Sequence, residues 1–306
     1  MVYLLRFYRE VWRAVKDYST PDVVIAHDFL LLPLGALVSL RFDCPLVYDA
    51  HEIYRWMDAG RLPEWWLRFA GWLEAKLVNH KVSLLVTVSR QRVDDYFRER
   101  VRLEPFILGN WYDPLEIEKR WARRKYEIQA GGRFCIGYVG SLATSRRVDL
   151  LLELAAARPD VQLILAGRGD PRLLSRVEKS AAEGSNVHYL GWVSNPAEVL
   201  AACDAIYYVL DPSHPYSRFA APNALYLAIS LDRPLIAVPV GEISVVAKRT
   251  DAVVELDELT VHGLSRAVDR ARRAQSWGQI RSEYNWSLAA ERYARAIGGL
   301  VDSGND

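Results

Sequence analysis

The chain has few cysteines, almost no net charge and no long apolar run. Its three cysteines, Cys44, Cys135 and Cys203, lie far apart, which excludes a closely spaced metal knuckle or redox motif and is typical of a reducing cytosol. A formal net charge of +1 offers no overall basic surplus for nucleic acid. The longest uncharged apolar run, residues 29–40, is too short for a membrane-spanning helix, which needs about 20 residues.

The N-terminus also lacks the charged, apolar and small-residue regions of a signal peptide, so we expect a cytoplasmic protein. Apolar content, by contrast, is high. Hydrophobic residues make up 51% of the 306 residues and charged residues 25%. This composition excludes a disordered chain, and the length is sufficient for two hydrophobic cores.

Short apolar runs that end in polar or glycine turns recur along the chain and are typical of strands. Helix-like segments with a period of about 3.6 residues lie between them. This alternation predicts an α/β protein with parallel sheets covered on both faces. The expected strands are residues 23–26, 46–48, 84–88, 135–139, 161–166, 187–190, 205–210, 235–238 and 252–255, and the expected helices include 2–16, 64–79, 91–100, 149–157, 171–183, 196–202 and 224–231.

One stretch, residues 110–133, interrupts this alternation, because it contains no strand pattern and is rich in Lys and Arg. A polar, basic segment between two α/β halves indicates a domain boundary. We therefore expect a first domain over residues 1–113, a basic linker over 114–130, a nucleotide-binding domain over 131–280, and a C-terminal helix and tail over 281–306.

Polar side chains follow the first two expected strands. His27 and Asp28 end one strand, and His51 and Glu52 end the next. Ligands bind at the carboxyl ends of strands in open parallel sheets, so these residues are candidates for orienting a substrate or moving a proton. A histidine that only hydrogen-bonds a turn is an equal alternative. Four such groups could bind a metal, but their spacing matches no metal motif, and we expect none.

Glycine turns follow the strands of the second half. Gly140 and Ser141 end one strand and precede Arg146 and a helix, an arrangement that favours a phosphate group but also fits a plain turn with a solvated arginine. The turns at Gly167 and Gly191 are weaker signals. Pro222, Asn223 and Ala224 open another helix, which either binds an anion or is capped by a side chain.

Nine stretches of the chain resemble, in the same order, the motifs of one enzyme family. Three are DVVIAHD at residues 22–28, PLVYDAHE at 45–52 and the stretch at 137–149, which begins with GYVGSL. The others are Glu74 with residues 84–89, and residues 110–113, 163–169, 187–193, 222–234 and 284–290. On these residues the chain resembles, over nearly its whole length, the retaining glycosyltransferases of family 4, also called group 1.

The resemblance implies the GT-B fold, in which two Rossmann-like domains face a cleft and a C-terminal helix crosses back to the first domain. It implies a UDP- or GDP-linked sugar donor in the second domain. Backbone groups of Gly140 and Ser141 would contact the diphosphate, Arg146 would stand where the family has a phosphate-binding lysine, and Gly167 would belong to a further donor loop.

The remaining implied roles fall on both domains. The turn at Gly191 and Trp192 would meet the nucleobase, and Pro222, Asn223 and Ala224 would cradle phosphate. In the first domain, His51 would stand at the family's cleft histidine, facing the donor sugar opposite Gly140 and the Asn223 helix start, with Glu52 beside it and with His27 and Asp28 toward the acceptor. Enzymes of this fold usually need no metal or other cofactor.

Three departures from the family pattern stand out. Ser141 occupies the place of an arginine, and Leu227 and Phe219 occupy the places of two glutamates, one of which binds the donor ribose. The sequence also opens in the helix that precedes the motif at residues 22–28, so we expect a shortened first domain with an incomplete crevice and an unpaired edge.

These features leave two interpretations. In one, the chain transfers a sugar to a glycan, lipid or small-molecule acceptor. In the other, it is a non-catalytic GT-B subunit or one half of a two-chain glycosyltransferase. For the unpaired edge we expect a second copy, a partner chain or a membrane surface that contacts the amphipathic helix over residues 2–16, unless that helix is ordinary core packing.

Overall fold

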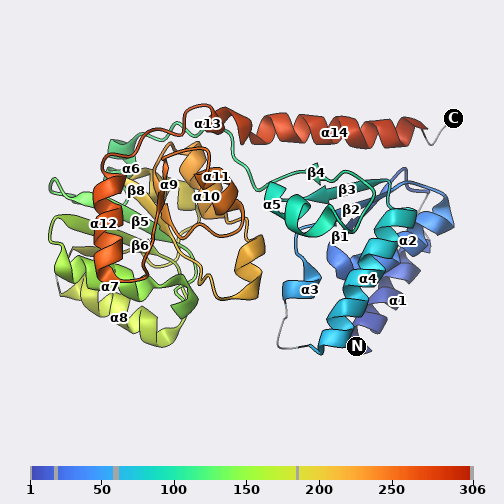
Figure 1. Ribbon diagram of the computed structural model, residues 1–306, viewed down its shortest axis with the longest axis horizontal. Helices are drawn as coiled ribbons and strands as arrows, with labels where there is room; N and C mark the ends of the chain where they lie inside the picture. The colour runs from blue at the N-terminus through green and yellow to red at the C-terminus, as the bar shows by residue number, and fades with distance from the viewer. Residues whose placement is uncertain (1, 17–19, 58–61, 184–185, 304–306) are drawn as a thin grey trace. The chain divides into compact units, whose positions relative to one another are not determined.

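The computed structural model describes residues 2–16, 20–57, 62–183 and 186–303 (Figure 1). The chain divides into two compact units. Unit 1 comprises Met1–Gly109 and Ser287–Asp306, and unit 2 comprises Asn110–Trp286. Each unit contains one sheet in which every pair of neighbouring strands is parallel, which confirms the α/β class that the sequence predicted.

Unit 1 has a four-stranded sheet in the order β1-β2-β3-β4. Consecutive strands are therefore neighbours, and β1 and β4 are the edges. The elements are α1 (Val2–Lys16), β1 (Val24–His27), α2 (Asp28–Phe42), β2 (Leu46–Ala50), α3 (Tyr54–Met57), α4 (Glu64–Lys81), β3 (Leu84–Thr87), α5 (Arg90–Arg92), a π-helical turn (Val93–Phe97), β4 (Phe106–Ile107) and α14 (Trp286–Ser303).

Unit 2 has a six-stranded sheet in the order β10-β9-β8-β5-β6-β7. The order reverses beside β5, so β5 and β8 are neighbours at the centre. The elements are α6 (Lys119–Lys125), β5 (Phe134–Val139), α7 (Val148–Ala157), β6 (Val161–Ala166), α8 (Pro171–Ala182), β7 (Val187–Tyr189), α9 (Pro196–Ala201), β8 (Ala205–Tyr208), α10 (Asn223–Ser230), β9 (Leu235–Ala237), α11 (Glu242–Ala247), β10 (Val253–Glu255), α12 (Val261–Ala271) and α13 (Ile280–Glu283), with 3₁₀ turns at Thr144–Arg146 and Pro215–Phe219.

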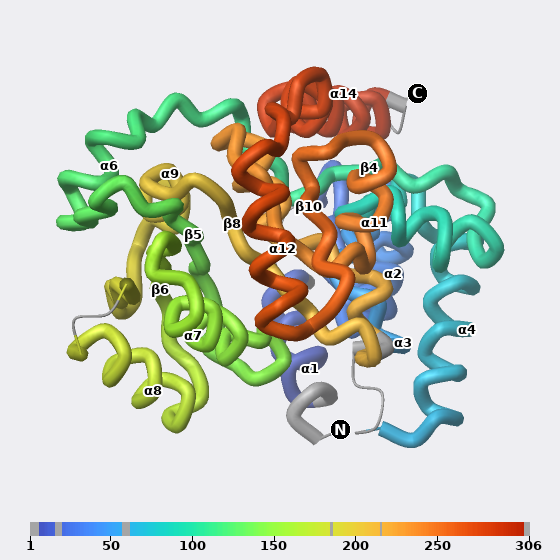
Figure 2. Tube along the Cα trace, turned by 60° about the vertical axis from the view of Figure 1, so that its left-hand side comes forward, coloured from blue at the N-terminus to red at the C-terminus, as the bar shows by residue number. Residues whose placement is uncertain are grey.

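The sheet of unit 2 is buried on both faces, because successive residues of its strands enter different hydrophobic clusters. Cys135 packs with residues of α9, α10 and α11, whereas Ile136 packs with residues of α7, α8 and α12. Helices α7 and α12 lie side by side on the second of these faces (Figure 2). A strand buried on both faces has no reason to alternate polar and apolar residues, which explains its continuous apolar pattern.

Several segments differ from their expected structure. The apolar run at residues 29–40, considered above only as a membrane candidate, forms most of α2. Strand β4 has two residues and was not expected. The helix expected over residues 91–100 is a short α-helix followed by the π-helical turn Val93–Phe97. Within the described residues, no helix is both long enough and apolar enough to cross a membrane.

The basic segment after residue 113 packs within unit 2 and contains α6. Lys119 and Arg123 pair with Asp204, and Lys125 pairs with Glu198. The cations that marked this stretch as polar therefore bind carboxylates at the start of β8 and on α9, which fixes α6 against the sheet.

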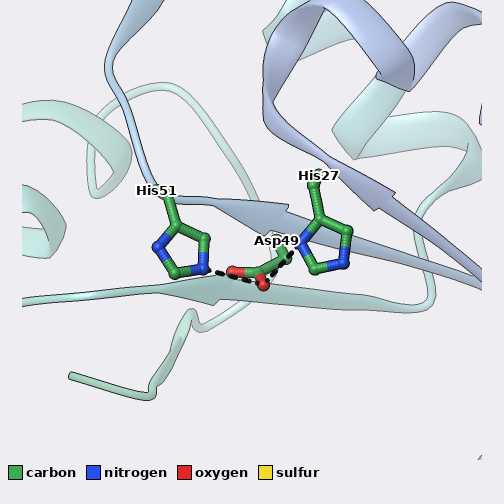
Figure 3. Close-up of side chains that lie close together, drawn as sticks. All are labelled: His27, Asp49 and His51. Atoms are coloured by element: carbon green, nitrogen blue, oxygen red, sulfur yellow. Dashed lines mark hydrogen bonds and ion pairs between the residues drawn. The ribbon is translucent and has the colours of Figure 1, made fainter. Parts of the chain in front are cut away.

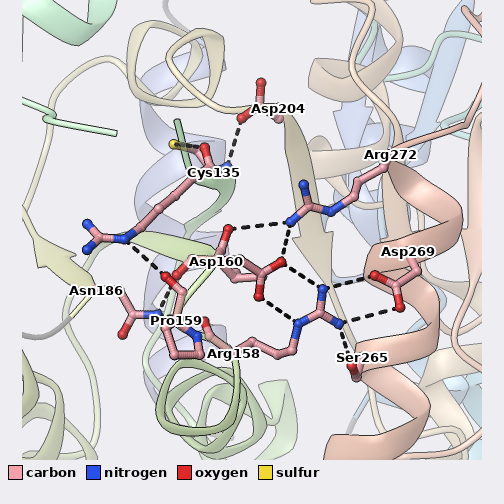
Figure 4. A network of polar contacts seen from close by, with 11 residues as sticks. Cys135, Arg158, Pro159, Asp160, Asn186, Asp204, Ser265, Asp269 and Arg272 are labelled. Atoms are coloured by element: carbon pink, nitrogen blue, oxygen red, sulfur yellow. Dashed lines mark hydrogen bonds and ion pairs between the residues drawn. The ribbon is translucent and has the colours of Figure 1, made fainter. Parts of the chain in front are cut away.

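A second ionic network joins the end of α7 and the start of β6 to α12 (Figure 4). Arg158 donates from Nε and from Nη2 to the two oxygens of Asp160, at 2.8 Å each, and from Nη2 to Asp269 at 3.0 Å. Arg272 donates to Asp160 at 2.7 Å. The hydrogen bonds from Arg158, and to a smaller extent the charge of Arg272, lower the pKa of Asp160 to about 2. Its carboxylate therefore remains charged across the neutral range.

Helix α14 packs on the edge strand β4 of unit 1, where the Tyr293 and Phe106 rings lie 5.8 Å apart (Figure 1). The opposite edge strand, β1, borders an apolar groove of about 610 Å³. Side chains of α1, β1 and α2 line this groove, among them Val11, Ile25 and Leu34. An apolar surface thus lies beside the first strand.

A buried carboxylate ties α4 to the sheet of unit 1. Glu74 is only 3% exposed, and its two carboxylate oxygens accept hydrogen bonds from the hydroxyl groups of Tyr48 on β2 and Tyr96 in the π-helical turn. Burial raises the pKa of Glu74, and the two tyrosine hydrogen bonds oppose that rise. The direction of the net shift shows that burial is the larger effect.

We expect Glu74→Gln to remove a pH dependence of stability. Because the folded state holds the Glu74 proton more tightly than the unfolded state, the wild-type free energy of unfolding falls as pH rises above the ordinary value of 4.5 and through the folded pKa. Glutamine does not titrate, so the free energy of unfolding of the variant rises relative to that of the wild type as pH rises. Urea unfolding at a series of pH values measures this difference. Glu291→Gln, at an exposed position on α14, is the control, and equal pH profiles for wild type and Glu74→Gln would contradict the prediction.

Candidate functional site

The carboxyl ends of β1 and β2 bring together a cluster of His27, Asp49 and His51 (Figure 3). His27 and Asp49 are register partners on the two neighbouring strands. His51 follows Asp49 by two residues and lies on the same side of the sheet. Asp49 Oδ2 accepts a hydrogen bond from His51 Nε2 at 3.0 Å and lies 3.0 Å from His27 Nδ1, within ion-pair distance.

The carboxylate of this cluster is buried and its imidazoles are not. The Asp49 side chain is 8% exposed, against 60% for His27 and 45% for His51. The hydrogen bond to Asp49 raises the pKa of His51, while burial opposes the rise. Because the Asp49 bond occupies Nε2, it orients the ring and leaves Nδ1 to bind a substrate, to accept a proton or, once protonated, to donate one.

Asp28 and Glu52 form the second part of the same strand edge. Asp28 has a positive φ of 59° at the start of α2, and its Oδ1 accepts from the Glu52 backbone N–H at 2.7 Å. Buried Arg92 lies 3.6 Å from Glu52 and also donates to the backbone carbonyl of His51. Burial raises the pKa of Glu52, and Arg92 opposes the rise. The four residues expected in the first domain thus share one sheet edge.

This cluster could also hold a metal ion. One possible ligand atom from each of His27, Asp49 and His51 lies within 4.8 Å of the other two. Two imidazoles and a carboxylate are ligands that zinc and other transition metals accept. The expectation of no metal therefore remains a prediction for this site.

In unit 2, the glycine turns after β5, β6 and β7 are bonded to one another. The Gly140 backbone N–H donates to Ala166 at 3.0 Å, and the Gly167 N–H donates to Gly191 at 2.7 Å. Gly167 has a φ of 135°, and a Cβ built on it would lie 1.8 Å from the Gly140 carbonyl oxygen. The close approach of these two turns therefore requires glycine at position 167.

Arg146 lies over the end of β8. Its guanidinium donates to the Tyr208 hydroxyl and stands 4.9 Å from the centre of the Tyr208 ring. Ser141 lies in the preceding turn, where its carbonyl accepts from the Tyr138 hydroxyl at 2.5 Å. The turn after β7 presents Trp192, which is 63% exposed. Besides the N–H group that donates to Tyr208, the Arg146 guanidinium has further N–H donors that can bind an oxyanion.

The N-terminus of α10 has no side-chain cap. The capping position is Pro222, and no side chain accepts from the first turn that contains Asn223 and Ala224. The alternative that a side chain caps this helix is therefore wrong, because proline carries no acceptor in its side chain. Since α10 follows β8, its N-terminus lies at the carboxyl edge of the sheet, with its dipole suited to an anion.

Phe219 and Leu227, where the resemblance led us to expect glutamates, are 2% and 5% exposed. Leu227 belongs to a hydrophobic cluster together with Tyr226 and Leu225. Both residues thus pack in the interior of unit 2, and neither supplies a polar group to the strand edge.

Sequence reasoning missed three residues of these sites. Asp49 was passed over as the end of a strand, although a carboxylate in the buried strand β2 is unusual. Arg92 and Tyr208 left no local signal, because they reach Glu52 and Arg146 only through the fold.

Comparison with known families agrees with the two-unit architecture. Residues 1–111 match the glycosyl transferase 4-like domain, and residues 133–271 match the glycosyl transferases group 1 domain. The chain belongs to the group 1 glycosyltransferases. The two matched regions of this glycosyltransferase contain the sheet of unit 1 and the sheet of unit 2, respectively.

Curated relatives share about half of this glycosyltransferase. The D-inositol 3-phosphate glycosyltransferases of Mycolicibacterium smegmatis and Mycolicibacterium vanbaalenii are each 29% identical to it, over 153 and 162 residues. Both matches cover 48% of this chain, but only 35% and 34% of the relatives, so the chain matches about a third of their length.

Solved structures extend the likeness of this glycosyltransferase to its whole fold. Anabaena HepE, solved with UDP, superposes with a TM-score of 0.71 at 16% identity, over 95% of this chain and 82% of that one. Sucrose-phosphate synthase from Thermosynechococcus elongatus superposes with a TM-score of 0.71 at 15% identity, over 98% and 78%. This glycosyltransferase has the GT-B fold.

We expect Gly167→Ala to destabilise unit 2. The new Cβ would meet the Gly140 carbonyl, and alanine is strained at a φ of 135°, so the free energy of unfolding should fall by more than about 2 kcal/mol. Urea unfolding followed by tryptophan fluorescence measures this loss. Gly298→Ala is the matched control, because its Cβ would enter open space on α14 and alanine favours a helix by up to about 1 kcal/mol. Equal stability for the two variants would contradict the role given to Gly167.

Proposed function

We propose that this glycosyltransferase moves a sugar from a UDP- or GDP-linked donor to a glycan, lipid or small-molecule acceptor, with retention of configuration at the sugar carbon that reacts. The names of similar proteins support a nucleotide-sugar donor: HepE was solved with UDP, with UDP and glucose, and with UDP-glucose. The curated relatives are named as glycosyltransferases that act on an inositol phosphate.

The observation that carries this proposal is the set of anion-binding features at one edge of the unit 2 sheet. Glycine turns follow β5, β6 and β7, Arg146 is held on Tyr208 after β8, and α10 starts without a side-chain cap. Backbone N–H groups, a helix N-terminus and a guanidinium are the groups that bind phosphates in proteins. We therefore assign the donor diphosphate to Gly140, Ser141, Arg146 and the helix start at Asn223.

The other donor assignments follow the same edge. Gly191 and Trp192 would meet the nucleobase, since an exposed indole offers a flat apolar surface for a base. As the glycosidic bond breaks, Arg146 and the N-terminus of α10 would stabilise the charge that develops on the leaving diphosphate. On this ground we propose that transfer needs no metal ion or other cofactor.

We assign to His51 a role in the transfer step rather than in nucleotide affinity. Asp49 holds the ring by Nε2, so the exposed ring edge can hydrogen-bond the sugar or the diphosphate while charge develops. Glu52 stands beside it, and His27 and Asp28 are the acceptor-side candidates at the same strand ends.

One observation favours a different function, that of a non-catalytic GT-B subunit or half of a two-chain enzyme. Phe219 and Leu227 are buried apolar residues where the family resemblance implies carboxylates, one of them for the donor ribose. A donor that lost one hydrogen bond to a charged group would bind more weakly by roughly 1.5–3 kcal/mol.

We expect Arg146→Ala to weaken the binding of UDP or GDP about 10- to 100-fold, the scale of a lost charge-assisted hydrogen bond. Titration calorimetry with both nucleotides measures the loss and also identifies the base. Arg266→Ala is the matched control, because it removes an exposed arginine of α12 that pairs only with the exposed Glu258 among the ion pairs of the described residues. Unchanged affinity in Arg146→Ala would show that the phosphate site is misplaced.

We expect His51→Ala to lower the rate of sugar transfer by about 10²-fold while nucleotide affinity stays within about threefold of wild type, because the nucleotide contacts are assigned to unit 2. The rate is measured with the donor whose nucleotide binds in calorimetry. An equal loss of rate and affinity would instead assign His51 to binding or folding. A wild-type protein that binds nucleotide but neither transfers nor hydrolyses the sugar would favour the non-catalytic subunit.

A further inference from the structure

The solvent-facing side of α4 is built from large aromatic residues. Trp65, Phe69 and Trp72 are 69%, 44% and 55% exposed, and their spacing of four and three residues places them on one face of the helix. The opposite face, which includes Leu67 and Val78, is buried in unit 1. A surface helix normally presents polar residues to solvent, whereas α4 presents large aromatic residues there.

These rings form a continuous surface, which we call the aromatic ridge: Trp65, Trp66, Phe69 and Trp72. Ring centres along it lie 5.9 Å apart from Trp65 to Trp66, 5.8 Å from Trp66 to Phe69 and 5.8 Å from Phe69 to Trp72. Trp66 is half-buried, and the other three rings are exposed. Single exposed hydrophobic residues are ordinary, but a row of contacting aromatic rings of which three are exposed marks an interaction surface.

A cation accompanies the aromatic ridge. Lys76 Nζ lies 5.0 Å from the centre of the Trp72 ring. The acidic residues of α4 do not offset it on this face, because Glu64 accepts from Arg68 at 3.0 Å and Glu74 is buried. The exposed face of α4 therefore combines indole rings with a net positive charge, that of Lys76.

This combination decides between the possible occupants. A second copy bound through a two-fold axis would set the face against itself and bring its cations together, which opposes association. Tryptophan rings prefer the headgroup level of a bilayer, and lysine side chains beside them reach lipid phosphates. We propose that the aromatic ridge of α4 binds the surface of a lipid bilayer that carries anionic headgroups.

In this arrangement α4 lies parallel to the bilayer surface, with its apolar outer face at the boundary between headgroups and acyl chains. Attraction of Lys76 to anionic lipid adds to the burial of the rings. The sequence had placed a membrane contact on residues 2–16. In α1, however, Trp12 is half-buried, and Val11 and Val15 line the groove beside β1, so α4 is the better-supported surface. The proposal does not depend on sugar transfer.

Vesicle co-sedimentation tests the proposal. The wild-type protein is mixed with vesicles of phosphatidylcholine alone or of phosphatidylcholine with phosphatidylglycerol, at low and high salt. We expect binding to the anionic vesicles that weakens with salt, and a loss of at least about tenfold in Trp65→Ser/Phe69→Ser/Trp72→Ser. Lys76→Glu, a single exposed change, should weaken binding without altering the fold, and thermal unfolding verifies that each variant is folded.

Trp121→Ser is the matched control, because Trp121 is also exposed and also has a lysine, Lys125, 4.9 Å from its ring centre, but lies on α6 in unit 2. It should bind anionic vesicles as the wild type does. Equal binding of the triple variant, or equal binding of wild type to neutral and anionic vesicles, would overturn the proposal. So would a wild-type dimer in light scattering that the triple variant dissociates, since the aromatic ridge would then cover a second copy.

Discussion

Parallel pairing of strands is the constraint on which both units depend. Two parallel neighbours need a crossover of about a dozen residues or more, so helices enter the connections and cover the sheet. The same pairing sends every carboxyl end to one edge. His27 comes to lie beside Asp49 because their strands are in register, and Gly140, Gly167 and Gly191 come together because β5, β6 and β7 are neighbours. Residues far apart in the chain thus meet without any local signal that pairs them.

Buried carboxylates then link stability to the sites. A carboxylate away from water is costly unless donors satisfy it, and the described part of unit 1 holds two such groups, Asp49 and Glu74. Glu74 accepts from Tyr48 and Tyr96, which joins α4 to the sheet. Asp49 accepts from His51 and lies 3.0 Å from His27, and both imidazoles remain partly exposed. The bond that satisfies the buried Asp49 is therefore the bond that orients His51, so a change at Asp49 alters both the stability of the fold and the exposed imidazole.

The sequence predicted those parts of the fold in which a residue pattern follows directly from burial. Apolar, β-branched runs ending at polar or glycine residues located nine strands, since buried parallel strands need such runs. Helix α2 gave no periodic signal, because it is apolar on almost every side and contains Pro33. Strand β4 has two residues, too few for any period, and the segment after β3 changes from α to π geometry within one turn. In these places tertiary contacts, rather than local pattern, decide the structure.

Candidate site residues were predictable when they follow strands, as His51 and Gly140 do, and not when they reach the site from elsewhere, as Arg92 and Tyr208 do.

The aromatic ridge could not be predicted from the sequence for a different reason. Trp65, Phe69 and Trp72 have the helical spacing of a core-facing stripe, so their sequence pattern alone predicts packing. Both faces of α4 carry apolar residues, and periodicity cannot say which face the sheet covers. Only the packing of Leu67 and its neighbours against unit 1 turns the aromatic row outward, and that makes it a surface in need of a partner.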